Sequence, residues 1–299
     1  GMSAILGSAN SVSIHPFNVS TGNMNDFSSR VARNQQFVLK EEAYLDKIAD
    51  PAAGSYYIET LTHQIASAAW DLFRQVESKG GLIQCIKSGF VQTEVEKSRK
   101  KKEADIAQRR MIMLGTNQFP NLSETLPERF QFVPEREEQA SSYQIMKPFR
   151  AAASFEKIRM STEQHVKAGN KRPVVFLFTM GNLAMLRARA GFATNFFGCA
   201  GYEIIDNPGF ESVEEGFAAA ISAAADIVVI CSSDEEYTSL VPAIADIFNH
   251  GSTPVKIVVA GYPKEQIEHF NSLGVKEFIH VRSDLLATLA SFQQYLKIS

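Results

Sequence analysis

Residues 173–181 read Pro-Val-Val-Phe-Leu-Phe-Thr-Met-Gly, and this apolar run that ends at a glycine decides the fold. Four further runs of the same kind follow it, and helical patterns lie between them: Tyr202–Ile205, Ile227–Cys231, Val255–Ala260 and Glu277–His280. Strands that are apolar on both faces and alternate with helices are typical of a parallel sheet covered on both sides. We therefore predict an α/β domain over residues 171–299, a flavodoxin-like, doubly wound sheet of five parallel strands.

In such a sheet, ligands bind beyond the carboxyl ends of the strands. The first loop there, Met180–Ala188, has neither a GxGxxG pattern nor a P-loop lysine, so it predicts no cradle for a nucleotide phosphate. Ser232 and Ser233 follow the third predicted strand, where they could donate to a ligand or cap a helix. The side chains that could line a cleft at this edge are Asn182, Ser232, Ser233 and Tyr262. We interpret Asp234, Glu235 and Glu236 as a solvated helix start.

The first 118 residues predict helices with few strands. Asp26 is the expected N-cap of the first clear helix, and Asp50–Gly54 is a helix breaker. Apolar residues at helical spacing from Ile58 to Val76 predict a long amphipathic helix. Met111–Gly115 reads as a short buried strand. Because this segment cannot close a sheet or barrel alone, we interpret it as the tail of a larger domain. Residues 119–170 form a proline-containing linker with one expected helix, Phe149–Lys167.

Composition and charge exclude several classes of protein. The net charge is −3, so no basic field exists to attract nucleic acid or a membrane surface. No apolar stretch reaches the ~18 residues of a membrane span. The three widely spaced cysteines favour reduced thiols in a cytoplasmic protein. No cluster of histidine and cysteine indicates a metal site.

Four segments, in this order, resemble acyl-CoA mutase sequences. Phe27–Gln36 resembles their "DFSxRIARNTQ" segment, and Asp50–Glu59 resembles "DPxxGSYYVE". Glu77–Gly89 resembles "ExxGGMxxAIExG", and Met111–Asn117 resembles the "VIVGVN" strand that closes the family's barrel. The resemblance is to the methylmalonyl-CoA mutase family, whose subunits join a substrate-binding (β/α)8 barrel to a flavodoxin-like cobalamin domain. It implies that residues 1–118 are the C-terminal part of such a barrel.

The resemblance also shows which cofactor contacts are missing. In cobalamin-binding chains of the family, the first loop of the flavodoxin-like domain reads "MGxDxHxxG", where the His ligates cobalt and the Asp orients that His. Aligned on Met180, the motif positions are held by Leu183, Met185 and Ala188. We expect no cofactor binding here, and we expect Met185 to serve core packing.

A second loop departs from the family pattern as well. Ser13-Ile14-His15 resembles the family's "SLHTNALDEA", in which an Asn and a Glu resemble the grip on the cofactor's adenosyl ribose. Counting onward places Phe17 and Thr21 at these positions, while a gap of one residue would place Asn18 at the Asn. His15 is retained, and without its neighbours we interpret it as a structural or rim residue.

The resemblance therefore implies the C-terminal half of a small, non-catalytic subunit, and Phe196–Glu203 resembles the small-subunit version of this domain. The partner would be a catalytic large subunit that carries adenosylcobalamin and isomerises methylmalonyl-CoA to succinyl-CoA. We expect this chain to bind no cofactor or metal and to have no catalytic residue. Two alternatives remain: a mutase chain that binds cobalamin without a His ligand, and a regulatory module that binds a small molecule at the edge of the sheet.

Overall fold

The computed structural model describes residues 1–19, 24–124, 144–146, 148–251 and 254–298, and its contacts divide the chain into two compact units. One unit is built around Gly1–Lys97, and the other contains Ser98–Thr125 and Phe149–Ser299. We describe each unit by itself, and the predicted boundaries at residues 118 and 170 stay a prediction.

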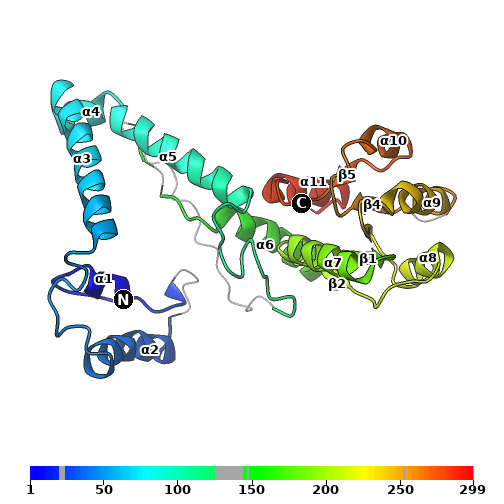
Figure 1. Ribbon diagram of the computed structural model, residues 1–299, viewed down its shortest axis with the longest axis horizontal. Helices are drawn as coiled ribbons and strands as arrows, with labels where there is room; N and C mark the ends of the chain where they lie inside the picture. The colour runs from blue at the N-terminus through cyan, green and yellow to red at the C-terminus, as the bar shows by residue number, and fades with distance from the viewer. Residues whose placement is uncertain (20–23, 125–143, 147, 252–253, 299) are drawn as a thin grey trace. The chain divides into compact units, whose positions relative to one another are not determined.

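The second unit contains a sheet of five parallel strands in the order β2-β1-β3-β4-β5 (Figure 1). Its strands are β1 (Val174–Thr179), β2 (Glu203–Ile205), β3 (Ile227–Cys231), β4 (Lys256–Val259) and β5 (Glu277–Phe278). Its helices are α6 (Ala153–Lys167), α7 (Leu183–Gly198), α8 (Val213–Ser222), α9 (Tyr237–Asn249), α10 (Ile267–Ser272) and α11 (Leu285–Tyr295). The predicted flavodoxin-like, doubly wound sheet is thus confirmed.

Alternation along the central strands builds a core on each face of the sheet. In β1, Val175 and Leu177 join one apolar cluster, while Phe176 and Phe178 join the other. Successive side chains of a strand point to opposite faces, which explains the split. Helices α6, α7 and α11 contribute to the first cluster, and α8, α9 and α10 to the second. Both faces are therefore covered, as the apolar runs predicted.

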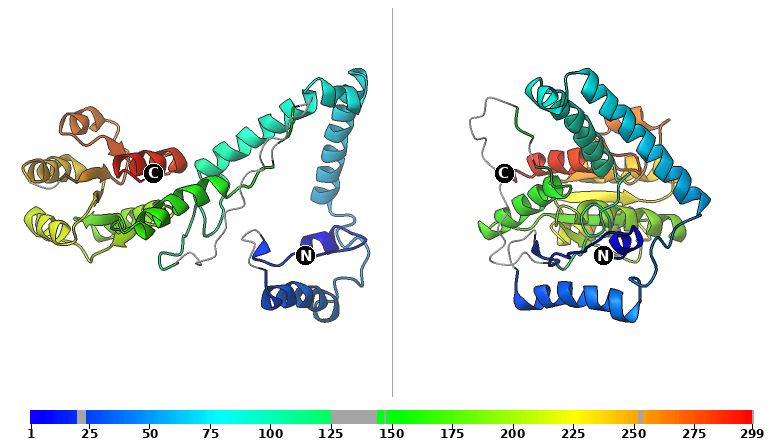
Figure 2. Two further views of the ribbon diagram at one scale, coloured as in Figure 1. Left: turned by 180° about the vertical axis from the view of Figure 1, so that it is seen from behind. Right: turned by 90° about the vertical axis from the view of Figure 1, so that its left-hand side faces the viewer.

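The first unit is helical and nearly without a core. Its elements are α1 (Met2–Leu6), α2 (Asp26–Phe37), η2 (Val38–Glu42), α3 (Tyr56–Ser78), α4 (Leu82–Lys87) and the start of α5 (Phe90–Ala107). Figure 2 shows α3 as a long helix that meets α4 at its far end. Among the described residues of this unit, the buried apolar side chains are Ala32 and Cys85, and α3 buries none. This unit therefore exposes apolar side chains that folded proteins normally cover.

Two local predictions for the first 118 residues are wrong. The N-cap of α2 is Asn25, whose side chain accepts a hydrogen bond from the Ser28 N–H at 2.9 Å, so Asp26 is the first helical residue instead. Met111–Gly115 is largely exposed and irregular and leads into a turn at Gly115–Asn117, so it is not a buried strand, and Leu114 makes only an isolated bridge. The backbone N–H of Met113 donates to the side-chain oxygen of Asn117 at 2.7 Å, so a side chain supplies the hydrogen-bond acceptor that a neighbouring strand would supply in a sheet.

Candidate functional site at the carboxyl edge of the sheet

The carboxyl ends of β1 and β3 lie side by side at the centre of the sheet. The chain leaves β1 towards one face through α7 and leaves β3 towards the other face through α9. A point where neighbouring connections diverge in this way is where doubly wound sheets bind ligands. The loops at this point, Met180–Asn182 and Ser232–Glu236, are therefore the candidate site.

The β1–α7 loop turns sharply and is capped by its own side chain. Gly181 has φ +90°, a conformation that favours glycine. Asn182 is the N-cap of α7, and its Oδ1 accepts hydrogen bonds from the backbone N–H groups of Ala184 at 3.1 Å and Met185 at 3.2 Å. The motif positions identified from the sequence thus lie on the first turns of a regular helix.

These motif positions face outward. Leu183 is 65% exposed, Met185 is 38% exposed, and Ala188 is exposed. The expectation that Met185 packs in the core is therefore wrong. The core-facing side chains of α7 recur at helical spacing and include Leu186, Ala190, Ala193 and Phe197. Met185 directly precedes Leu186 in the sequence and does not belong to this buried face.

A carboxylate, Glu236, organises the β3–α9 loop. The hydroxyl of Ser232 lies 2.6 Å from Glu236 Oε2, and the hydroxyl of Ser233 lies 2.8 Å from it. The backbone N–H of Ser233 donates to the same oxygen at 3.2 Å, and that of Asn182 donates to Oε1 at 3.1 Å. These donors, above all the Ser232 hydroxyl, lower the pKa of Glu236 to about 2.

The interpretation of Asp234, Glu235 and Glu236 as a solvated helix start is confirmed in part. Asp234 and Glu235 are exposed and Glu236 is the N-cap of α9, but Glu236 is half-buried and accepts hydrogen bonds from both loops. Ser233 and Glu236 stand at the S-x-x-E spacing of a capping box, and the Glu236 N–H donates back to Ser233 Oγ at 3.3 Å. That spacing was the available signal for the local contact. The hydrogen bond between Asn182 and Glu236 could not be predicted from local spacing, because the two residues are 54 positions apart.

The Glu236 side chain also lies close to the backbone of Gly181. A Cβ at position 181 would collide with the Glu236 carboxylate. Ser232 is fully buried, and its Oγ lies 2.7 Å from the Met180 carbonyl as well as against Glu236. The loops are therefore packed against each other at the point where a ligand would enter.

Tyr237 fills the space next to this contact. Its side chain is fully buried, its hydroxyl donates to the Ala260 carbonyl at 2.7 Å, and it accepts from the Ser232 N–H at 3.2 Å. Burial raises the pKa of Tyr237. The hydroxyl thus ties the ends of β3 and β4 together.

The structure brings together three of the four residues expected to line a cleft. Asn182, Ser232 and Ser233 meet at Glu236. Tyr262 is 47% exposed, and its ring contacts that of His280 with centroids 4.6 Å apart. Burial, with a smaller effect of a nearby arginine, lowers the pKa of His280.

The barrel-loop positions can be followed only in part. Phe17 is 69% exposed, and its ring meets that of Phe27 edge to face at 6.4 Å. His15 is exposed and Asn18 is half-buried. Thr21 lies outside the residues that the structure describes. Phe17 offers a hydrocarbon ring where a ribose would need a hydrogen-bonding partner.

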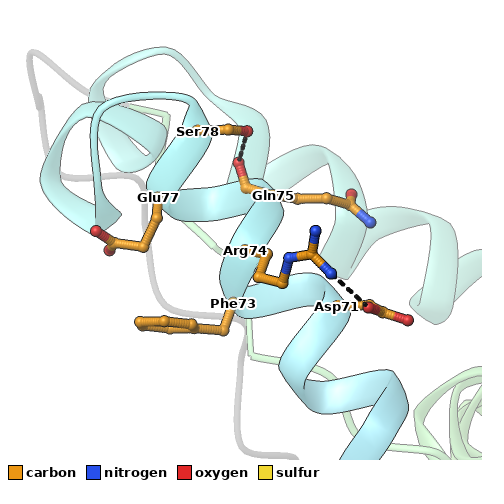
Figure 3. Close-up of a pocket in the computed structure, with 6 residues that line it drawn as sticks. All are labelled: Asp71, Phe73, Arg74, Gln75, Glu77 and Ser78. Carbon is orange, nitrogen blue, oxygen red and sulfur yellow. Dashed lines mark hydrogen bonds and ion pairs between the residues drawn. The ribbon is translucent and has the colours of Figure 1, made fainter.

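A hollow in the first unit runs along the last turns of α3. Figure 3 shows the side chains that line it, all from this helix: Asp71, Phe73, Arg74, Gln75, Glu77 and Ser78. The Arg74 guanidinium lies 3.8 Å from the Asp71 carboxylate, and both side chains are largely exposed. A hollow built by one helix surface brings no polar groups from different elements together, so we do not treat it as a binding site.

The residues that the structure describes contain neither a metal-binding cluster nor a membrane-spanning helix. Among them, no three His, Cys, Asp or Glu side chains are grouped in a way that could hold a metal ion. No helix in this part of the chain combines the length and the apolar character that a bilayer crossing requires.

Comparison with known proteins yields consistent similarities. A family model described as "Methylmalonyl-CoA mutase" matches residues 1–190. The "Methylmalonyl-CoA mutase small subunit" of Porphyromonas gingivalis is 46% identical over 97% of this chain and 46% of its own length. The protein of the same name from Streptomyces virginiae is 29% identical over 97% of this chain and 45% of its own length. The "Methylmalonyl-CoA mutase" of Rhizobium meliloti is 35% identical over 40% of this chain. The chain thus spans less than half the length of these relatives.

Proposed function

Since this chain belongs to the methylmalonyl-CoA mutase family, we propose that it is part of the small, non-catalytic subunit of a heterodimeric methylmalonyl-CoA mutase. The observation that carries the proposal is the similarity along 97% of the chain to a protein named as a small subunit. The isomerisation of methylmalonyl-CoA to succinyl-CoA would take place on a large subunit, where adenosylcobalamin supplies the radical when bound.

The side chains at the carboxyl edge do not fit that cofactor. The family's loop offers an imidazole and a carboxylate, whereas Leu183 offers hydrocarbon and Met185 offers a thioether. A thioether is a weak, uncharged acceptor with no second nitrogen for an orienting hydrogen bond. We therefore derive no catalytic step from this chain, and we propose that it binds no cobalamin.

An assembly role is supported by the first unit. Helix α3 exposes apolar side chains along its length, among them Trp70 at 62% and Phe73 at 49%, whose rings stack with centroids 5.1 Å apart. Exposed apolar faces of this kind mark surfaces that another protein segment covers. We propose that these faces are covered in the assembled mutase.

One observation favours a second candidate, a chain that binds cobalamin without a histidine. Met185 is partly exposed at the edge of the sheet, so its sulfur could be reached from outside. In this case Met185→Leu, which keeps the volume but removes the sulfur, should abolish cobalamin binding. The regulatory module is less favoured, because Asn182, Ser232 and Ser233 already donate to Glu236.

The test is reconstitution with a catalytic partner. This chain, affinity-tagged, is co-expressed with a methylmalonyl-CoA mutase large subunit, and the purified material is analysed by size-exclusion chromatography with mass determination. We expect a 1:1 complex, with mutase activity in the complex and none in the isolated chain.

A titration with adenosylcobalamin, followed by its visible spectrum, separates the two candidates. The isolated chain should leave the spectrum of adenosylcobalamin unchanged. The Met185→Leu variant, which lacks the sulfur, is the matched control and should also leave it unchanged. Stoichiometric binding by the isolated wild-type chain would refute the non-binding subunit and support the second candidate.

The compartment stays a prediction. Cys85, Cys199 and Cys231 are free and buried, which supports the expected cytoplasmic location of a protein without disulfides.

A further inference from the structure

A hollow in the first unit is lined by α1, α2, η2 and two loops, and we call it the η2 hollow. Its volume is about 600 Å³, which lies within the range of small-molecule sites. Among its lining residues, 8–12 follow α1, Leu39 and Lys40 belong to η2, and Leu45 and Ile48 lie in the loop after η2. The hollow along α3 comes from one helix surface, whereas the η2 hollow brings together side chains from separate segments.

Backbone hydrogen bonds hold the segments around the η2 hollow in place. η2 itself is a π-helical turn, a rare conformation that is frequent at functional sites. The Leu45 N–H donates to the Leu39 carbonyl at 3.2 Å, which holds the following loop against η2. The Ala9 N–H donates to the Ala4 carbonyl at 3.0 Å, which holds residues 8–12 against the end of α1. Two of the walls are thus formed before any ligand binds.

The η2 hollow combines uncovered hydrocarbon with unpaired polar groups. The side chains of Ser8, Asn10 and Ser11 make no hydrogen bond with another described residue. Ile48 is 65% exposed, although it lines a concave site. An apolar surface with a few polar groups is typical of sites for small molecules. The apolar part of the lining comes from several segments and includes Ile5, Val12, Leu39, Leu45 and Ile48.

The charged groups of the lining favour an anionic head group. The Lys40 ammonium lies 3.4 Å from the Glu41 carboxylate. Because an ammonium has three donors, this contact leaves Lys40 able to donate to a ligand. Asp46, the carboxylate of the lining, lies 3.6 Å from the Lys47 ammonium, which balances its charge. Hydroxyl and amide groups of residues 8–12 can add further donors, so a carboxylate fits this set better than an ammonium.

We propose that the η2 hollow binds a small amphipathic carboxylate. The hydrocarbon of this ligand lies against Leu39, Leu45 and Ile48. Its carboxylate accepts hydrogen bonds from Lys40 and from the polar side chains of residues 8–12. The site is independent of the proposed subunit role, because it lies within the first unit and needs no partner chain.

Titration of the full chain with octanoate, followed at single amides by NMR, tests the site. We expect saturable shifts of the amides of residues 8–12 and of Leu45 at millimolar octanoate, whereas octylamine, which has the same chain and the opposite charge, should bind more weakly. Lys40→Ala should weaken octanoate binding about threefold or more and leave the binding of uncharged octanol unchanged. Lys87→Ala is the matched control, because Lys87 is exposed in the same unit and lies outside the hollow, and it should bind octanoate like the wild type.

Ile48→Asp tests the apolar wall. Because Ile48 is largely exposed, this variant should keep the fold, and it should bind both octanoate and octanol more weakly than the wild type. The site is refuted if octanoate causes no saturable shift in the wild type, or if Lys40→Ala and Lys87→Ala weaken binding equally. Preferential binding of octylamine would overturn the assignment of a carboxylate ligand, and unchanged octanol binding by Ile48→Asp would contradict the apolar wall.

Discussion

Asn117 offers a sharp test of how the turn after α5 is held. Its side chain is fully buried. It accepts a hydrogen bond from the Met113 N–H at 2.7 Å and donates to the carbonyls of Ile106 and Met111, both at 2.9 Å. Asn117→Ala removes all three bonds and leaves the backbone groups of a tight turn without this partner.

The expected loss follows from the count of bonds. Each contributes about 1 kcal/mol net, and groups left unsatisfied add to the loss, so we expect about 2 to 4 kcal/mol. With a urea dependence of about 2 kcal/mol per molar, the unfolding midpoint should fall by roughly 1 to 2 M. Far-ultraviolet circular dichroism follows this transition. The fluorescence of Trp70, the one tryptophan of the chain, reports the other unit, and its transition should not move.

Asn121→Ala is the matched control for this experiment. Asn121 is exposed and accepts hydrogen bonds only from the backbone and hydroxyl of Ser123 among the contacts described. Its replacement should change the free energy of unfolding by less than about 0.5 kcal/mol. If Asn117→Ala is no more destabilising than Asn121→Ala, the turn is not held by the Asn117 side chain and the reasoning is wrong.

Three further predictions concern the same unit. Gly216→Ala should destabilise it by about 1 to 3 kcal/mol in thermal unfolding, because the new Cβ would meet the Phe178 ring, whereas Gly191→Ala has open space and should be neutral or slightly stabilising. The pKa of Glu163 is lowered, chiefly by its hydrogen bonds to a neighbouring arginine, so its stabilisation should be present above pH ~4 and be lost as the pH falls through the folded-state pKa. The difference in urea midpoint between wild type and Glu163→Gln should therefore shrink below pH ~4, and a constant difference would contradict this. Burial raises the pKa of Cys199 to about 12, so a thiol reagent at pH ~8 should label it only after unfolding; rapid labelling of the folded chain would contradict its burial.

Much of the fold could be predicted because the information is local. The apolar runs of β1 and β3 and the helical spacing of α7 and α9 each lie within a few consecutive residues. Burial on both faces imposes a continuous apolar run on a strand, whatever its neighbours are. The doubly wound class was inferred from five such units in a row, and the order β2-β1-β3-β4-β5 agrees with it.

The candidate site was predicted only in part. Asn182, Ser232 and Ser233 were expected at one edge because parallel strands end together, and they do meet there. That they meet around Glu236 was missed, since an acidic residue at a helix start more often only favours the helix dipole than accepts hydrogen bonds from a second loop. Met185 was misplaced for a related reason, because an apolar residue in a helix reads as core until the buried face of that helix is known.

The sequence by itself determined the alternation of strands and helices in residues 171–299, the parallel sheet they form, and the absence of an imidazole at Met185. Only the tertiary structure decided what fills the edge of that sheet, since Asn182 and Glu236 are 54 residues apart and their contact depends on β1 and β3 pairing in register. Local patterns record which face of an element is buried. They do not record which distant side chain supplies the hydrogen bonds of a loop, because one carboxylate can accept them from any donors that the fold brings within reach.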